Sequence, residues 1–315
     1  MKYRKFGNSG IEVSVVGLGT WPLGSDFFGD VEEAAGIRTI QRAIDIGVNL
    51  IDTAPAYGQN HEAETAVGKA LRGRRDKAVI STKFGVHRIY GEYVRCLSPS
   101  VVQVELENSL KRLDTDCIDI YFIHWPDKNF GIEGALELLA KFKKEGKIRA
   151  GAVSNFSVEQ MKTAVEIGGI SGIQPSASIL DRSNFDNGVI PFARENDLGI
   201  MTYGSLGGGI LSGAFEKPPV VSGTELRSFF YDFFTEPKWS KCGKVVDTLR
   251  EIAGARGVSA AEVAINWVLA QPGVTTALIG TTKPVNLEKN AKAAEWELSA
   301  DELAKIDDSF KKNLG

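Results

Sequence analysis

Polar side chains close four short apolar runs in this sequence of 315 residues. The positions are Asp52, Lys83, His124 and the pair Ser154 and Asn155, and the runs before them are rich in β-branched or aromatic residues. Such runs are typical of buried strands. If the strands are parallel, their carboxyl ends converge on one face and bring the polar side chains together. The pattern therefore predicts an active site assembled from successive strand ends.

A tyrosine in the loop after the first of these positions adds a candidate acid. Tyr57 follows Asp52 by five residues. A phenol has a pKa of about 10, and a nearby ammonium, such as that of Lys83, lowers it. Asp52 could pair with Lys83 and orient it, and His124 could donate a hydrogen bond to a carbonyl oxygen beside the phenol. Together these groups could polarise a carbonyl for attack by a hydride.

The segments that must position these residues alternate between strand-like and helix-like patterns along almost the whole chain. The expected strands cover residues 15–18, 50–52, 79–83, 117–124, 148–153, 173–174, 199–203 and 276–279. The expected helices cover residues 33–46, 62–71, 100–113, 133–145, 189–195, 243–255, 285–293 and 299–311, and two more begin at the capping boxes of Ser157 and Ser259. Eight strand–helix units predict an α/β fold of the (β/α)8 TIM barrel type.

Two segments lie outside this alternation. Residues 3–6 and 11–13 predict an N-terminal β-hairpin that could plug the amino-terminal end of the barrel. A long loop at 204–242, after strand 7, is expected to pack onto the barrel or, alternatively, to close over a ligand. Its aromatic residues are Phe229, Phe230, Tyr231, Phe233, Phe234 and Trp239. A doubly wound dinucleotide fold would need a GxGxxG motif, which this sequence lacks, so we expect one barrel domain over residues 1–315.

Composition narrows the classes of partner. The chain is 43% hydrophobic and 24% charged with a net charge of −3, which is ordinary for a soluble protein and favours neither nucleic acid nor a membrane as partner. Its three cysteines have no CxxC spacing, so we expect neither disulfides nor a metal site, and a reducing, cytoplasmic setting. The start of the chain does not read as a signal peptide. The expected partner is a small molecule, and the oligomeric state stays open.

Several motifs, in order, resemble those of the aldo-keto reductases. The catalytic pattern of that family is matched by DTAPAYG at 52–58, STK at 81–83 and IHWPD at 123–127. The resemblance continues over nearly the whole chain in GLGTW at 17–21, GAVSNF at 151–156, QP at 174–175 and IGTTK at 279–283. It implies a (β/α)8 carbonyl reductase that uses NADP(H), or less often NAD(H). Its catalytic tetrad would be Asp52, Tyr57 as the general acid, Lys83 and His124.

The same resemblance implies a cofactor site. Ser154, Asn155 and Gln174 would hold the nicotinamide carboxamide, and Tyr203 would stack on its ring. The diphosphate would lie on the loop after Tyr203, and the 2′-phosphate before the helix at 285–293, where a helix N-terminus favours anions. The whole implied set is Trp21, Asp52, Ser154, Asn155, Gln174, Tyr203, Gly204, Ser205, Leu206, Gly207, Gly280, Thr282, Lys283, Asn286 and Asn290.

This chain departs from the family pattern at two positions of that site. Gly204 is followed directly by Ser205, so a proline that relatives often carry in this loop is missing. Lys283 lies where an arginine often helps to fix the 2′-phosphate, and a lysine makes a looser contact.

The sequence leaves the substrate and two other functions open. We expect reduction of an aldehyde or ketone to an alcohol, or the reverse. A substrate pocket with both aromatic and polar walls would suit a sugar or hydroxy-carbonyl compound without excluding an aromatic aldehyde. The expected walls are Trp21, Asp26, Phe28, Arg88, Tyr90, Tyr93 and Trp125. One alternative is a Schiff-base lyase that uses Lys83 as nucleophile. The other is a nucleotide-sensing regulatory subunit with little turnover.

Overall fold

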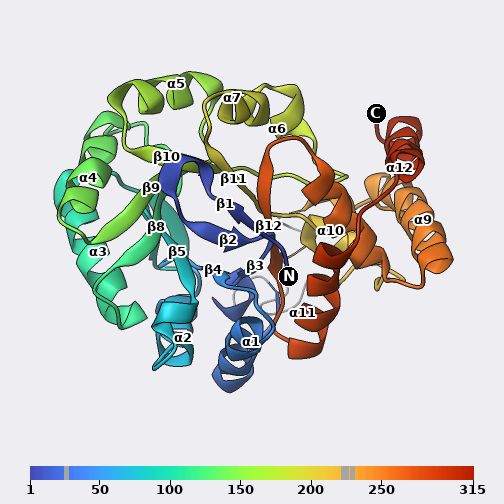
Figure 1. The fold of residues 1–315 in the computed structure, drawn as a ribbon, viewed down its shortest axis with the longest axis horizontal. Coiled ribbons are helices and arrows are strands. Elements are labelled where there is room, and N and C mark those ends of the chain that lie inside the picture. Colours follow the sequence, from blue (N-terminus) through green and yellow to red (C-terminus); the bar gives the residue numbers. More distant parts are fainter. Residues whose placement is uncertain (25–27, 221–226, 228–230) are drawn as a thin grey trace.

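Parallel strands close into a barrel surrounded by helices (Figure 1). The computed structural model describes residues 1–24, 28–220, 227 and 231–315. Within that part of the chain the barrel strands are β3 (Val16–Gly19), β4 (Leu50–Asp52), β5 (Val79–Phe84), β8 (Ile118–Ile123), β9 (Ile148–Ser154), β10 (Ile170–Gln174), β11 (Gly199–Thr202) and β12 (Val274–Gly280). They follow one another around the barrel in chain order, and β12 pairs with β3 to close it. The expected (β/α)8 barrel is confirmed.

Helices cover the outside of the barrel and bury its outer face. They are α1 (Glu33–Asp45), α2 (Glu62–Ala70), α3 (Pro99–Leu113), α4 (Glu133–Lys144), α5 (Val158–Ile167), α6 (Ser183–Asp186), α7 (Val189–Glu195), α9 (Lys238–Arg256), α10 (Ala260–Ala270), α11 (Pro284–Ala291) and α12 (Ala300–Asn313). Short 3-10 helices cover Gly7–Ser9, Trp21–Gly24, Arg75–Lys77, Gly207–Ser212, Asp232–Phe234 and Lys292–Glu295. Among the described residues, no helix is both long and apolar enough to cross a bilayer.

Local sequence signals explain where several helices begin. The capping boxes at Ser157, Ser259 and Ser299 all form, with each serine hydroxyl accepting from the backbone N–H three residues on. Helix α9 begins at Lys238 and not at residue 243 as expected. The earlier turn is stabilised by packing, since the Trp239 ring stacks on Phe234 with their centroids 6.1 Å apart. That contact joins the helix to its preceding loop and has no local signature in sequence.

The N-terminal hairpin plugs one end of the barrel, as expected. Strands β1 (Tyr3–Lys5) and β2 (Glu12–Ser14) pair in antiparallel fashion, and Phe6 is fully buried against Phe122. The Phe6 ring lies so close to the barrel backbone that a Cβ at Gly172 would be 2.2 Å from it, and one at Gly199 2.5 Å from it. Only glycine at these positions leaves room for the plug, which seals the inner core from this end.

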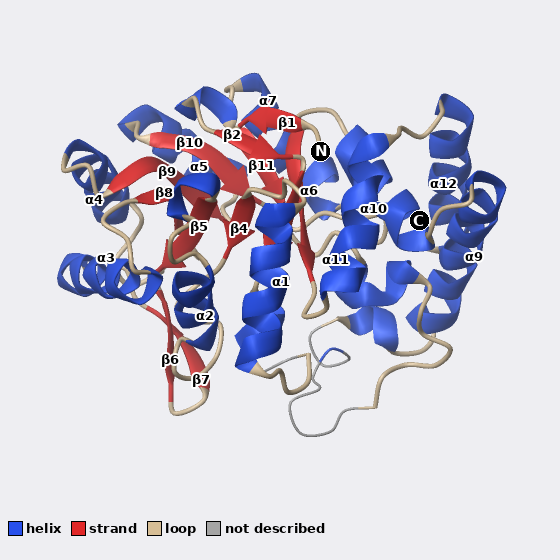
Figure 2. Ribbon diagram, turned by 60° about the horizontal axis from the view of Figure 1, so that its bottom comes forward, coloured by secondary structure: helices blue, strands red, loops and turns tan. Residues whose placement is uncertain are grey.

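A second hairpin extends from the opposite end of the barrel (Figure 2). Strands β6 (Val86–Ile89) and β7 (Glu92–Arg95) pair across a two-residue turn, Tyr90–Gly91, in which both residues have positive φ. These two strands are not among those expected from the sequence, which places none between residues 83 and 100. The turn signal was present, because a residue followed by glycine between short alternating segments favours a type I′ hairpin. Residues of this hairpin reach the cavity described below.

Two buried carboxylates hold the base of this hairpin. The backbone N–H of Gly85 donates to Glu105 on α3, with the nitrogen 3.1 Å from the nearer oxygen. The backbone N–H of Leu97 donates to Asp127 over 3.0 Å, and the N–H of Cys96 closes the hairpin on Gly85. Burial raises the pKa of the Glu105 carboxyl from 4.5 to about 8. The hairpin is therefore attached to the barrel through a carboxyl that titrates near neutral pH.

We expect replacement of Glu105 by glutamine to flatten the dependence of stability on pH. An acid whose pKa is higher in the folded state stabilises the fold fully below its unfolded pKa, and this contribution is lost as pH rises through about 8. The free energy of unfolding should thus fall between pH 5 and pH 8 in the wild type, by about 1.4 kcal/mol for each unit of pKa difference. Urea titrations at pH 5, 6.5 and 8 would measure the slope. Equal slopes in both proteins would show that Glu105 is not the titrating group.

Candidate functional site

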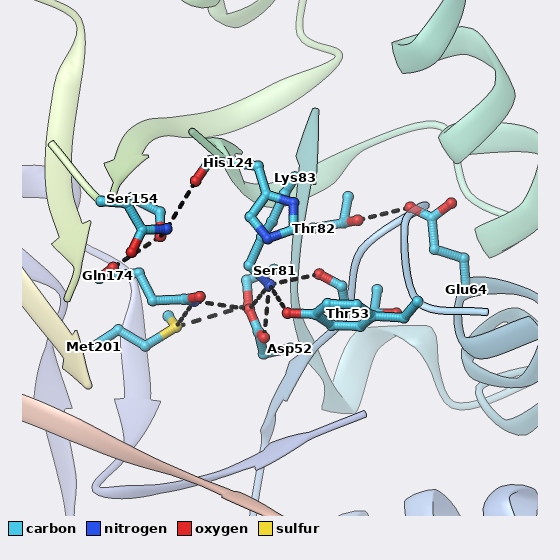
Figure 3. Close-up of polar contacts among 12 residues, drawn as sticks. Asp52, Thr53, Glu64, Ser81, Thr82, Lys83, His124, Ser154, Gln174 and Met201 are labelled. Atoms are coloured by element: carbon cyan, nitrogen blue, oxygen red, sulfur yellow. Dashed lines mark hydrogen bonds and ion pairs between the residues drawn. The ribbon is translucent and has the colours of Figure 1, made fainter. Parts of the chain in front are cut away.

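The ammonium of Lys83 is the centre of a buried polar cluster at the carboxyl ends of the strands (Figure 3). Its Nζ atom donates to both oxygens of Asp52, at 2.8 and 2.9 Å. It also lies 2.8 Å from the carbonyl oxygen of Thr53 and 3.0 Å from the hydroxyl of Tyr57. The side chain of Lys83 is fully buried, so these acceptors take up the three hydrogens of the ammonium.

Strand register explains this convergence. Asp52 ends β4 opposite Ser81 of β5, and the Ser81 hydroxyl donates to Asp52 over 2.8 Å. Side chains two apart on a strand share a face, so Lys83 also points into the barrel. Thr82, between them, points outward and donates over 2.6 Å to Glu64, which pairs with Arg112. Both faces of β5 thus carry satisfied buried polar groups next to Lys83.

His124 joins the cluster from the loop after β8. Its ring lies edge-on to the ring of Tyr57 with centroids 6.0 Å apart. Burial, together with the charge of Lys83, lowers the pKa of His124 well below its ordinary value, so the imidazole is neutral near pH 7. Burial also lowers the pKa of Lys83, while the Asp52 carboxylate opposes that shift. A neutral imidazole next to a phenol can donate one hydrogen bond to an uncharged oxygen.

A cavity of about 400 Å³ opens in front of this cluster. Among the described residues, twelve of the predicted site residues line it: Trp21, Asp52, Tyr57, His124, Ser154, Asn155, Gln174, Tyr203, Gly204, Ser205, Leu206 and Gly280. Lys83 lies behind this lining. A volume of this size falls in the usual range for small-molecule sites, about 300–1,000 Å³.

Amide and hydroxyl groups form one wall of the cavity. The Gln174 side-chain nitrogen donates to Asp52 over 2.9 Å, and the Ser154 hydroxyl donates to the carbonyl oxygen of Gln174 over 2.8 Å. The Asn155 amide donates to the carbonyl oxygen of His124, and its oxygen accepts from the Tyr203 hydroxyl. These fixed donors and acceptors, on β9, β10 and the end of β11, match the chemistry of a carboxamide.

A run of glycines forms the floor beyond Tyr203. Gly207, Gly208 and Gly209 have φ values of 56°, 67° and 103°, and a Cβ at Gly208 would be 2.6 Å from the Tyr231 ring. Successive backbone N–H groups in left-handed or turn conformations form concave surfaces that bind anions. The run therefore offers a backbone surface of the kind that can bind an anion.

The structure places four predicted cofactor residues beyond the cavity lining. Lys283 precedes the first turn of α11 and is exposed, Thr282 is half-buried, Asn286 is exposed and Asn290 is buried on the helix. They lie past Gly280, which pairs with Gly19 at the rim of the cavity. Gly207 is buried and is also absent from the lining.

The expected substrate walls are only partly correct. Phe28, Tyr93 and Trp125 line the cavity, whereas Tyr90 is fully exposed at a hairpin turn and Arg88 lies outside the lining. Asp26, Phe229 and Phe230 fall outside the described residues. Of the other loop aromatics, Tyr231 reaches the cavity, while Phe233, Phe234 and Trp239 pack on the barrel core. The described part of the loop therefore packs onto the barrel, as expected, and Tyr231 contributes to the cavity lining.

Two arginines of the cavity were missed by the analysis of the sequence. Arg95 ends β7, and its guanidinium carbon lies 4.4 Å from the centroid of the Trp125 ring. Arg227 lies between the rings of Phe28 and Phe215, at 5.4 and 5.3 Å. Neither arginine belongs to a motif, and only the hairpin signal at residues 90–91 could have indicated where Arg95 points.

Fold and site together define a barrel with a buried ionic cluster at its strand ends and a cavity lined in part by amide side chains. The Aldo/keto reductase family model matches residues 15–311. Aldo-keto reductase YhdN of Bacillus subtilis is 38% identical over 97% of this chain and 92% of that protein. An NADH-specific methylglyoxal reductase of Escherichia coli is 30% identical over 95% of each. The chain belongs to the aldo/keto reductase family, whose members are oxidoreductases with nicotinamide cofactors.

A solved structure agrees with this assignment. The glycerol dehydrogenase AKR11B4 from Gluconobacter oxydans superposes with a TM-score of 0.90 at 34% identity, covering 99% of this chain and 96% of that one. The resemblance in motifs and the barrel fold are thus both confirmed by comparison.

Proposed function

We propose that this protein reduces an aldehyde or ketone to an alcohol, or runs the reverse reaction, with Tyr57 as the general acid or base. One observation carries the proposal: the Lys83 ammonium contacts the Asp52 carboxylate and the Tyr57 hydroxyl at once, and Tyr57 lines the cavity. An ammonium 3.0 Å from a phenol oxygen favours the phenolate and so eases proton release.

Each member of the tetrad has a distinct role in this proposal. Tyr57 donates its proton to the carbonyl oxygen during reduction and takes it back during oxidation. The positive charge of Lys83 stabilises the phenolate that forms when Tyr57 gives up its proton, and Asp52 holds the ammonium in place. Neutral His124 donates a hydrogen bond to the same carbonyl oxygen and orients the substrate.

The carboxamide-like wall and the glycine run fit a nicotinamide cofactor. Asn155 and Gln174 are the groups that would hold the carboxamide, and the backbone of residues 205–207 would hold the diphosphate, with Trp21 and Tyr203 beside the ring. When bound, a reduced nicotinamide supplies the hydride. The residues of the site position the carbonyl carbon in front of it and exclude water from the cavity.

The substrate that we propose is a small hydroxy- or oxo-carbonyl compound. The cavity mixes aromatic walls with hydroxyl and amide groups, which suits a polar carbonyl compound. The names of two relatives support this class, since one is a methylglyoxal reductase and the other a glycerol dehydrogenase. A panel of carbonyls and sugars, followed by nicotinamide absorbance with NADPH and with NADH, tests the proposal. Absence of turnover with every carbonyl and both cofactors would contradict it.

The geometry argues against the two other functions considered. A Schiff-base lyase needs a lysine that can lose its proton and reach a substrate, but Lys83 is fully buried and shares its hydrogens among three residues. Borohydride trapping in the presence of substrate should give no adduct. A regulatory subunit with little turnover would not need the complete tetrad, and steady-state turnover in the same panel separates that possibility.

Lys283 is the residue that we propose selects NADP(H) over NAD(H). It is the N-cap residue of α11, where the helix dipole favours an anion. A charge-assisted hydrogen bond contributes about 1.5–3 kcal/mol. Lys283→Ala should therefore weaken the binding of NADPH about ten-fold or more and leave the affinity for NADH nearly unchanged. Fluorescence titration of both nucleotides measures this.

A matched control is available on the same helix. Lys289 is exposed in the last turn of α11, and Lys289→Ala should leave both affinities near wild type. Equal losses of NADPH and NADH in Lys283→Ala would show that Lys283 does not read the phosphate, and would favour the NADH preference named for the Escherichia coli relative.

A further inference from the structure

The cavity holds an arginine whose charge has no acidic partner in the described part of the chain. Arg95 lines the cavity beside Trp125, and its guanidinium carbon lies 4.4 Å from the centroid of the indole, within the range of a cation–π contact. Arg75 and Arg112, by contrast, are paired with an acid, Arg75 with Asp119 at 2.7 Å and Arg112 with Glu64 at 2.6 Å. Arg95 therefore keeps its hydrogen-bond donors available to a ligand.

The base of the hairpin holds the backbone next to Arg95, whose side chain is exposed at the rim of the cavity. Leu97, two residues on, donates its N–H to Asp127, and Asp127 is two residues beyond Trp125. One hydrogen bond thus ties together the two segments that carry the stacked pair. A cation–π contact uses none of the five N–H donors of a guanidinium as a hydrogen bond to an acceptor oxygen, so they can bind a planar or tetrahedral anion.

We propose that Arg95 recognises a negatively charged group, a carboxylate or a phosphate, on the carbonyl substrate. This proposal rests on the proposed carbonyl reduction and narrows its substrate class to acidic aldehydes and ketones. Arg95 would bind the anion at the mouth of the cavity while Tyr57 and His124 hold the carbonyl oxygen at its inner end. It is a specificity-determining residue and takes no part in proton transfer.

The charge balance of the cavity agrees with this assignment. Among the described lining residues Asp52 is the single acid, and its charge is already matched by Lys83. The positive charge of Arg95 contributes to the lowered pKa of His124, so its field extends to the reacting end of the cavity. Arg227 lies on the other wall, with a guanidinium nitrogen 3.6 Å from where a Cβ of Gly209 would be, and so belongs to the glycine run.

Substrate pairs in which one member carries an anionic group and the other is neutral test the proposal. We would measure kcat/KM for 4-carboxybenzaldehyde against 4-formylbenzamide, and for glyceraldehyde 3-phosphate against glyceraldehyde, so that carboxylate and phosphate are separated. Arg95→Met should lower kcat/KM for at least one of the two anions by about ten-fold or more, through KM, with the neutral partner changed less than about two-fold. Arg95→Lys should recover part of the loss, and added salt should weaken the wild-type preference.

Arg88→Met is the matched control, because Arg88 lies on the same hairpin but outside the cavity lining. This substitution should leave kcat/KM unchanged for both members of each substrate pair. The proposal is overturned if Arg95→Met lowers kcat/KM equally for charged and neutral substrates, or if Arg88→Met lowers kcat/KM for the anions as much as Arg95→Met does. It is also overturned if Arg95→Met weakens NADPH binding by as large a factor as it lowers kcat/KM for the anion. Failure of carbonyl reduction itself would appear differently, as absent turnover of the neutral partners by the wild type.

Discussion

Tyr57→Phe should lower kcat for carbonyl reduction by about 10²–10⁴-fold while the variant binds the cofactor almost as the wild type does. The substitution removes only the hydroxyl that contacts Lys83 over 3.0 Å, and the ring can keep its contacts with Trp21 and His124. The group proposed to donate the proton is thereby deleted with little change in packing. Single-turnover rates with NADPH, beside fluorescence titration of the cofactor, measure the two effects separately.

The cavity supplies a control for this result. Tyr93 also lines it, from strand β7, and Tyr93→Phe removes a phenol hydroxyl at a distance from the ammonium cluster. Its turnover should stay within a few-fold of wild type. Burial raises the pKa of Tyr203 and Tyr231, so these other lining phenols are weaker acids and should not replace Tyr57. Turnover of Tyr57→Phe close to that of the wild type would remove Tyr57 from the mechanism.

Lys83→Met should be the second large effect, acting on both activity and stability. Without the ammonium, the phenol loses its stabilising charge, so turnover should fall by about 10²-fold or more and the basic limb of the pH profile for reduction should move upward. The same substitution leaves Asp52 buried without its ionic partner, which typically costs about 3–5 kcal/mol. Turnover against pH and urea unfolding measure the two parts.

A double variant separates the chemistry from the fold. In Lys83→Met combined with Asp52→Asn the unpaired buried charge is removed, and most of the lost stability should return because Ser81 still has an acceptor at position 52. Activity should stay low, since the ammonium is still missing. If the single variant keeps the wild-type pH profile and maximal rate, Lys83 does not tune the phenol; if the double variant regains activity, the loss came from misfolding.

Much of this protein follows from local patterns in its sequence. Alternating strand and helix signals define the barrel, because each short apolar run must be buried and each amphipathic helix must cover it. Polar residues at the ends of β4, β5, β8 and β9 then have to share one face. The tetrad could therefore be predicted without any coordinates, and capping boxes such as that at Ser259 located helix starts to the residue.

Contacts between distant segments were decided only by the tertiary structure. Gln174 donates to Asp52, which lies 122 positions earlier in the chain. This contact follows from closure of the barrel, and no local pattern in the sequence predicts it. The space for Phe6 depends on Gly172 of β10 and Gly199 of β11. These two strands pair only in the folded barrel. Local propensity describes which element a segment forms, but such contacts depend on register and on packing across the barrel.

Arg95 shows the same limit in the functional site. In sequence it is one charged residue among many in a segment without strand signals except the turn at Tyr90–Gly91. The folded hairpin, held through Asp127, brings its guanidinium over Trp125 and into the cavity. The sequence alone indicated the family through its motifs and the barrel through its strand–helix alternation, and it placed Asp52, Lys83 and His124 on one face because parallel strand ends converge. Only the tertiary structure decided which charged side chains line the cavity, because that depends on how loops of different strands pack together.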